Sequence, residues 1–131
     1  MCMPTSTIKM KAKGSAAERE LVTMLWGTNF AAIRAAGSGV TKFYCPDVLA
    51  SNGSKIIAVE CKSTKHKYQY FDPEQIRQLL EFSKMFKAEP WLAVKFSTDW
   101  KFFRPEDLKQ TGKAFVVTLE NNSKLLADLT S

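Results

Sequence analysis

Three residues near the middle of the chain have types and spacing suited to the chemistry of phosphate esters. Asp47 follows Pro46, and Glu60 and Lys62 stand at alternate positions in a later apolar segment. Two converging carboxylates suit a hard divalent cation such as Mg²⁺, which polarises a phosphoryl oxygen and activates a bound water. A nearby ammonium orients that water or offsets developing charge. The set therefore indicates hydrolysis of a phosphodiester.

A β-hairpin is the element that must position these groups. Segments 47–50 and 55–62 flank a turn at 51–54 that contains Asn52-Gly53. A loop of two or four residues places Asp47 opposite Ala58 and makes Glu60 its diagonal neighbour on the same face. Strand alternation adds Lys62 to that face. The other face takes Ile57, Val59 and Cys61.

Two alternatives to this arrangement stay open at the level of the hairpin. A loop of three or five residues would reverse the parity, and Glu60 and Lys62 would also suit a solvated polar edge. The apolar run 56–59, however, is typical of a strand buried on both faces. A carboxylate that follows such a run needs a partner.

Glu18 is a candidate third carboxylate. Residues Ser15 to Glu18 form a capping-box pattern, which predicts a helix from Ser15 to about Trp26. Helical spacing places Glu18 on the same stripe as Leu21 and Leu25, so it faces the sheet. Glu18 would serve the cap alone, or would also bind the metal or its waters.

The rest of the chain predicts a mixed α/β fold. Asp72-Pro73 predicts the start of a second helix that runs to about Lys87. The sequence pattern further predicts strands at 30–34, 91–97, 100–104 and 115–119, a loop at 37–46 and a final helical turn at 123–129. This order favours a central mixed sheet flanked by helices.

Length and charge limit the classes of protein that remain. A chain of 131 residues predicts one domain, here 13–131, preceded by a flexible basic tail at 1–12. No apolar run is long enough for a membrane helix, and we expect a cytoplasmic protein. The net charge is +6 and its excess lies before residue 68, as expected of a face that binds nucleic acid or of a solvated basic surface.

Four segments resemble the archaeal Holliday-junction resolvases, which belong to the PD-(D/E)xK nucleases with a restriction-endonuclease-like core. The matching segments are 13–21, 30–38, Pro46-Asp47 and Val59-Glu60-Cys61-Lys62, and 80–86 adds a further match. The resemblance extends from about Lys13 to Arg104. It implies a structure-selective endonuclease that uses Mg²⁺, with Mn²⁺ as a substitute, and nicks two opposing strands of a four-way DNA junction as a homodimer. No small-molecule cofactor is expected.

The resemblance also implies roles for individual residues. Asp47, Glu60 and Glu18 would bind metal, Lys62 would serve the attacking water, and Ser38 would lie near the scissile phosphate. Gln75 matches a supporting glutamine of related nucleases. The expected contacts to DNA come from Lys13, Arg19, Arg34, Lys65 and Lys67.

Phe82 and Phe86 in the second helix are candidates for a dimer interface. The apolar arc of that helix is wider than one surface helix needs, although an i, i+4 pair of phenylalanines would also complete the core of a monomer. A dimer would match the twofold symmetry of a four-way junction.

Two further functions remain compatible with the residues. The same carboxylates would serve a repair or restriction-type nuclease that cuts duplex or flap DNA. A junction-binding protein without catalysis would keep the basic surface, but it would have no need for acids that face phosphates.

Overall fold

The computed structural model describes residues 5–35, 43–120 and 122–131, with side chains from Gly14 onward. Its elements, in chain order, are α1 (Thr5–Trp26), β1 (Ala31–Arg34), β2 (Val48–Ser51), β3 (Ile56–Thr64), β4 (Tyr68–Phe71), α2 (Pro73–Phe86), β5 (Glu89–Phe96), β6 (Asp99–Phe103), a 3-10 turn η2 (Pro105–Asp107), β7 (Lys109–Thr111), β8 (Ala114–Thr118) and α3 (Leu126–Thr130). None of the helices in these ranges is long and apolar enough to span a membrane.

A five-stranded mixed sheet forms the centre of the fold, in the order β1-β2-β3-β5-β6. The β3–β5 pair is parallel and its neighbours pair antiparallel. A parallel pair needs a crossover connection, and β4 with α2 supplies it. The predicted mixed sheet flanked by helices is confirmed.

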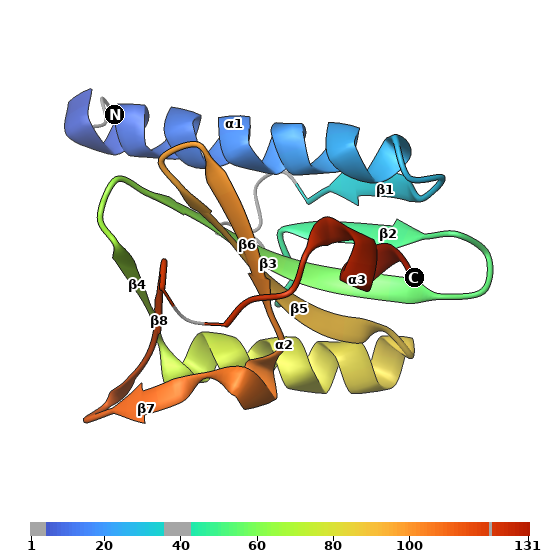
Figure 1. The fold of residues 1–131 in the computed structure, drawn as a ribbon. Helices are drawn as coiled ribbons and strands as arrows, with labels where there is room; N and C mark the ends of the chain where they lie inside the picture. Colours follow the sequence, from blue (N-terminus) through green and yellow to red (C-terminus); the bar gives the residue numbers. More distant parts are fainter. Residues whose placement is uncertain (1–4, 36–42, 121) are drawn as a thin grey trace.

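The two long helices cover opposite faces of this sheet (Figure 1). On the α1 side, Leu21 and Leu25 pack in one buried cluster with Val59 of β3. On the α2 side, Ile76 and Leu79 pack in a second cluster with Ala58 of β3. The first four residues of β3 are apolar, and its polar residues begin at Glu60 and continue with Lys62 in the second half of the strand.

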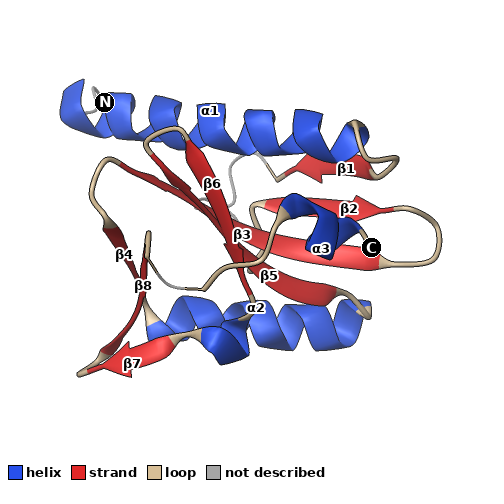
Figure 2. Cartoon of the chain, viewed as in Figure 1, coloured by secondary structure: helices blue, strands red, loops and turns tan. Residues whose placement is uncertain are grey.

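A smaller sheet, in the order β4-β8-β7, lies beside the start of α2 (Figure 2). Neither β4 nor β7 was predicted. No element was predicted between residues 62 and 72, where the basic residues at 65–67 mark a polar stretch, and β4 spans only four residues. Its aromatic residues were the available signal, since aromatic side chains are enriched in strands.

The first helix differs from its prediction. It begins at Thr5, ten residues before the predicted start at Ser15, so residues 5–12, which we expected to form a tail, belong to the helix. Ser15 therefore lies inside the helix and does not cap it. Segment 9–13 alternates Lys with Met and Ala, all good helix formers, and this propensity allows the helix to extend past the cap pattern.

The second helix agrees with its prediction. Asp72 is the N-cap, and its carboxylate accepts a hydrogen bond of 2.8 Å from the backbone N–H of Glu74. Pro73 occupies the first turn, where a missing N–H costs nothing. The helix ends at Phe86, and Lys87 follows in the left-handed conformation.

The hairpin loop fixes how β2 and β3 align, and Gly53 within it has φ of +94°. We expect Gly53→Ala to lower the free energy of unfolding by about 1 kcal/mol, because a Cβ is strained in this conformation. Gly14→Ala, in the helical interior of α1 with open space around it, should raise it by about 0.5–1 kcal/mol. Urea denaturation measures both, and a Gly53→Ala variant as stable as the wild type would contradict the expectation.

Candidate metal and phosphodiester site

Asp47 and Glu60 meet on one face of the hairpin. Val48 pairs with Val59, and both belong to the α1-side core. Extending this pairing by one residue brings Asp47 directly opposite Glu60, on the α2 side. The predicted partner of Asp47 was Ala58, which was wrong: the loop comprises Asn52 to Lys55, so the pairing is shifted by two. A shift of two preserves parity, and the predicted shared face is therefore retained.

Glu60 is held where its negative charge is costly. The residue is only 5% exposed. Burial first, and the neighbouring Asp47 charge second, raise the pKa of Glu60 to about 8, while a hydrogen bond from Tyr44 and the charge of Lys62 act in the opposite direction. A cation placed between the two carboxylates would remove this penalty.

The backbone of β3 orients Asp47. The N–H of Cys61 donates a hydrogen bond of 2.9 Å to Oδ2 of Asp47, so one carboxylate oxygen is fixed by the strand. The carbonyl of Asp47 in turn accepts a bond of 2.9 Å from the N–H of Ala35. Both bonds position Asp47 before any ligand binds.

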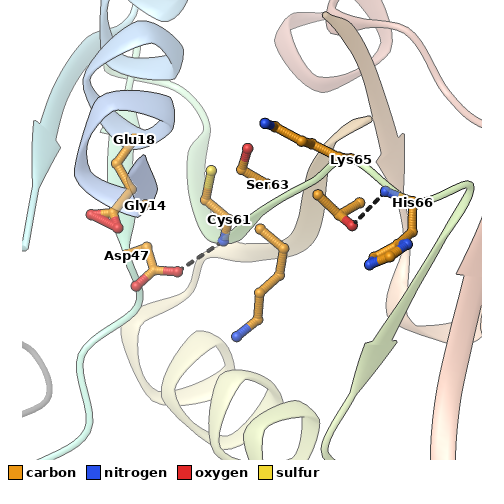
Figure 3. A pocket seen from close by; sticks show the side chains of 9 residues that line it. Gly14, Glu18, Asp47, Cys61, Ser63, Lys65 and His66 are labelled. Atoms are coloured by element: carbon orange, nitrogen blue, oxygen red, sulfur yellow. Dashed lines mark hydrogen bonds between the residues drawn. The ribbon is translucent and has the colours of Figure 1, made fainter. Parts of the chain in front are cut away.

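Glu18 approaches Asp47 from α1. Figure 3 shows its carboxylate directed from the helix towards Asp47. Burial, followed by the Asp47 charge, raises the pKa of Glu18, and the adjacent Arg34 opposes this shift. Arg34 Nη1 lies 3.4 Å from Glu18 Oε1. The prediction that Glu18 faces the sheet is therefore confirmed, and Arg34 contacts it from β1.

Two hollows adjoin these carboxylates, and Asp47 and Lys62 line both of them. The residues of the Glu18 hollow are Gly14, Glu18, Asp47, Cys61, Lys62, Ser63, Thr64, Lys65 and His66 (Figure 3). The residues of the Glu60 hollow are Tyr44, Cys45, Asp47, Glu60, Lys62, Gln75 and Gln78.

The donor chemistry suits a hard divalent cation. Mg²⁺ is usually held by one or two carboxylates, with waters and substrate phosphates completing its shell. The pair of Asp47 and Glu60 meets that requirement. Within the described ranges no group of three Asp, Glu, His or Cys side chains is assembled as a closed metal cluster. Glu18 therefore stands beside the pair and does not complete a three-carboxylate set with it.

The residues predicted to contact DNA or to form a dimer interface lie in several different environments. Lys65 lines the Glu18 hollow, whereas Arg19 and Lys67 are exposed and line neither hollow. Phe82 is partly buried in the α2-side core, and Phe86 is 47% exposed. The side chain of Lys13 and the whole of Ser38 fall outside the described residues.

Sequence reasoning missed Tyr44, whose hydroxyl donates a hydrogen bond to Glu60 Oε1. The same ring packs edge-on against Phe82, at 6.0 Å between ring centroids. A lone tyrosine three residues before Asp47 carries no spacing signal, so only the folded structure reveals this contact.

Comparison with known proteins gives a consistent result. The family model described as archaeal Holliday junction resolvase (Hjc) matches residues 9–131. The chain is 42% identical over 109 residues to the crossover junction endodeoxyribonuclease Hjc of Archaeoglobus fulgidus, covering 82% of this chain and 80% of that protein. It is 35% identical over 113 residues to the enzyme Hje of Saccharolobus solfataricus, covering 83% and 81%. The solved structure of Archaeoglobus fulgidus Hjc superimposes with a TM-score of 0.75 at 40% identity, covering 80% of this chain and 88% of that one.

Fold and site together define an α/β nuclease: a mixed sheet between helices, with one carboxylate just before β2 and a second carboxylate and a lysine in the adjacent strand β3. Within that class, the chain belongs to the archaeal Holliday junction resolvase family. The family is consistent with the use of a divalent metal ion, as is the donor set described above.

The buried carboxylate predicts how stability depends on pH in metal-free protein. Between about pH 4.5 and 8 folded Glu60 keeps a proton that the unfolded chain releases, so the free energy of unfolding should fall as pH rises through this window. The slope is at most about 1.4 kcal/mol per pH unit for one proton. Glu60→Gln should flatten the slope, measured by urea denaturation in a chelator.

The matched control for this measurement is Glu120→Gln, since Glu120 is exposed in the turn after β8. It should leave the pH dependence unchanged. A Glu60→Gln protein with the slope of the wild type would show that Glu60 ionises freely in the folded state.

Proposed function

We propose that this protein is an endonuclease that resolves four-way DNA junctions by Mg²⁺-dependent hydrolysis, nicking two opposing strands as a homodimer. Mn²⁺ would substitute for Mg²⁺. The observation that carries the proposal is the pairing of Asp47 with buried Glu60, beside Lys62, in a chain of the resolvase family. The relatives that it matches are named crossover junction endodeoxyribonucleases.

Asp47 and Glu60 are the residues that would hold the metal ion. When bound, the ion supplies Lewis-acid polarisation of a phosphoryl oxygen and a water of lowered pKa. Glu18 lies close enough to Asp47 for the charge of Asp47 to raise the pKa of Glu18, and it would contact waters of the ion. Arg34 keeps the Glu18 carboxylate beside the site.

Lys62 is the cation best placed to act on the reacting groups. It is half-buried and lines both hollows, so a phosphate entering either one meets its ammonium. Its proposed role is to orient the attacking water and to offset charge on the phosphoryl oxygens. Tyr44 would keep Glu60 in place, since it donates a hydrogen bond to that carboxylate.

The surface around the site favours DNA as the substrate. Lys65 lines the Glu18 hollow, and Arg19 and Lys67 are exposed nearby in the same basic half of the chain. Lys13 and Ser38 keep the roles that the resemblance implies, contact with DNA and a position near the scissile phosphate. Such a substrate would be met in the cytoplasm of an archaeal cell.

Removing either carboxylate should separate cutting from binding. We expect Asp47→Ala and Glu60→Ala to reduce nicking of a synthetic four-way junction by about a thousandfold or more. Junction affinity should be retained, because the change removes negative charge from a face that receives phosphates. Single-turnover cleavage in Mg²⁺ and gel-shift titration in Ca²⁺ measure the two quantities.

The control variant is Asp107→Ala, an exposed carboxylate that lines neither hollow, and it should cut like the wild type. Nicking by Asp47→Ala in the presence of a chelator would overturn the mechanism. A linear duplex of the same sequence tests substrate choice: equal cutting of duplex and junction would instead indicate a general duplex nuclease.

An exposed apolar surface supports the homodimer. The edge strand β1 exposes Ile33 (63%), and Trp26 (58%) and Phe86 (47%) line the same shallow groove. Phe82 stacks on Phe86 with 5.0 Å between ring centroids. Contiguous apolar surface of this kind marks interaction sites, and a twofold dimer presents two active sites to a twofold-symmetric junction.

Phe86→Glu should convert the dimer to a monomer, because it places a charge in the apolar groove. Sedimentation velocity measures the mass, and a supercoiled cruciform plasmid reports whether the two nicks occur within one binding event. The matched control, Leu125→Glu, lies beside β6 at the opposite edge of the sheet and should remain dimeric. A wild-type protein that sediments as a monomer would contradict the dimer.

A further inference from the structure

The small sheet presents an aromatic outer face. Phe71 of β4 is 1% exposed and packs in the α2-side core, opposite Phe115 of β8. Tyr68 and Tyr70 alternate with it and are 46% and 52% exposed. Two large rings thus lie on the solvent side of a strand that has already buried its inner face.

These rings form a continuous row with His66. The imidazole of His66 stacks on Tyr68 with 5.4 Å between centroids and 20° between planes. Tyr68 meets Tyr70 edge-on, also at 5.4 Å. We call this row of His66, Tyr68 and Tyr70 the aromatic ladder. Hydrogen bonds from His66 N–H to Thr64 Oγ1 (3.0 Å) and from Leu119 N–H to the Lys67 carbonyl (2.8 Å) hold the backbone that carries it.

The aromatic ladder begins at the active site. His66 lines the Glu18 hollow together with Glu18 and Asp47 (Figure 3). Tyr68 and Tyr70 belong to β4, the next strand along the chain, and β4 forms part of the small sheet (Figure 1). The ladder is therefore continuous with the surface on which a scissile phosphate would lie.

Lysine residues lie near the aromatic ladder. Lys65 and Lys67 flank His66 in the sequence, and both are exposed. Lys109 of β7 pairs with Val116, which pairs with Tyr70, so direct cross-strand neighbours bring Lys109 to the ladder's face. Exposed rings interleaved with lysines favour a polyanion that also carries flat apolar groups, which describes DNA bases on a phosphate backbone.

We propose that the aromatic ladder is a stacking surface for DNA bases that leave the helical stack at the branch point, beside the strand that is cut. Its ligand is unstacked nucleobases, and the proposal rests on the proposed junction-cutting function. Paired bases inside a duplex arm are stacked on one another and offer no free face. The ladder thus adds affinity at the branch point and little along an arm.

Alanine variants test this contact. Tyr68→Ala and Tyr70→Ala should each weaken binding to a four-way junction by about tenfold, since stacking of one base is worth about that factor. Affinity for a linear duplex of the same sequence should be unchanged. Tyr68→Phe and Tyr70→Phe keep the ring, remove only the hydroxyl, and should bind the junction like the wild type.

Salt dependence separates stacking from phosphate contact. The slope of log affinity against log salt should be the same for Tyr68→Ala as for the wild type. Lys67→Ala, which removes a charge beside the same ring, should reduce the slope by about one. A Tyr68→Ala protein with wild-type junction affinity, or one that loses junction and duplex affinity alike, would overturn the proposal.

Crosslinking of the wild-type protein provides a test that needs no variant to fold. Junctions that carry 5-iododeoxyuridine at the branch point are irradiated, and the crosslinked peptide is identified by mass spectrometry. Crosslinks at Tyr68, Tyr70 or His66 support the proposal, and crosslinks confined to other segments overturn it. Wild-type protein that fails to cut any junction would instead contradict the proposed function, so the two failures are distinguishable.

Discussion

The site depends on the repulsion between two carboxylates, Asp47 and Glu60, which the pairing of β2 and β3 brings together where little solvent reaches Glu60. Asp47 and Glu60 are brought together by strand pairing, and burial makes the second negative charge unfavourable at neutral pH. A hydrogen bond from Tyr44, the Cys61 amide and the ammonium of Lys62 each offset part of that cost. The part of this electrostatic cost that these contacts do not offset would favour binding of a divalent cation. Without the cation, this uncompensated cost lowers the stability of the folded protein.

Several elements of the fold position Asp47, Glu60 and the residues around them. The hairpin sets one carboxylate against the other, and the crossover through α2 brings Gln75 and Gln78 to the Glu60 hollow. On the opposite face, α1 supplies Glu18. Because β3 is packed between the two helices, its polar end has little freedom to move, and rigid placement is what metal and phosphate chemistry requires.

The sequence was most informative where parity or a cap decided the outcome. Strand alternation predicted that Asp47 and Glu60 lie on the same face. This prediction is correct although the predicted register is wrong by two residues, because side chains return to the same face every two residues. The start of α2 followed from Asp72-Pro73. The start of α1 was misplaced because a capping pattern also occurs inside helices, and β4 was missed because lysines precede its short aromatic run. Tyr44 was beyond reach, since its contact with Glu60 depends on tertiary geometry alone.

Asp47 lies at the rim of the sheet and borders the cavities of both faces, as Lys62 also does. Among the described residues, α1 is the helix that lines the first cavity and α2 is the helix that lines the second. Substitutions in one helix would therefore change how that side of the protein contacts a bent or branched nucleic acid and leave the other side unchanged. Asp47 and Lys62, which line both cavities, would have to be retained. In this arrangement the two helices would determine substrate preference, and Asp47 and Lys62 would serve bond cleavage.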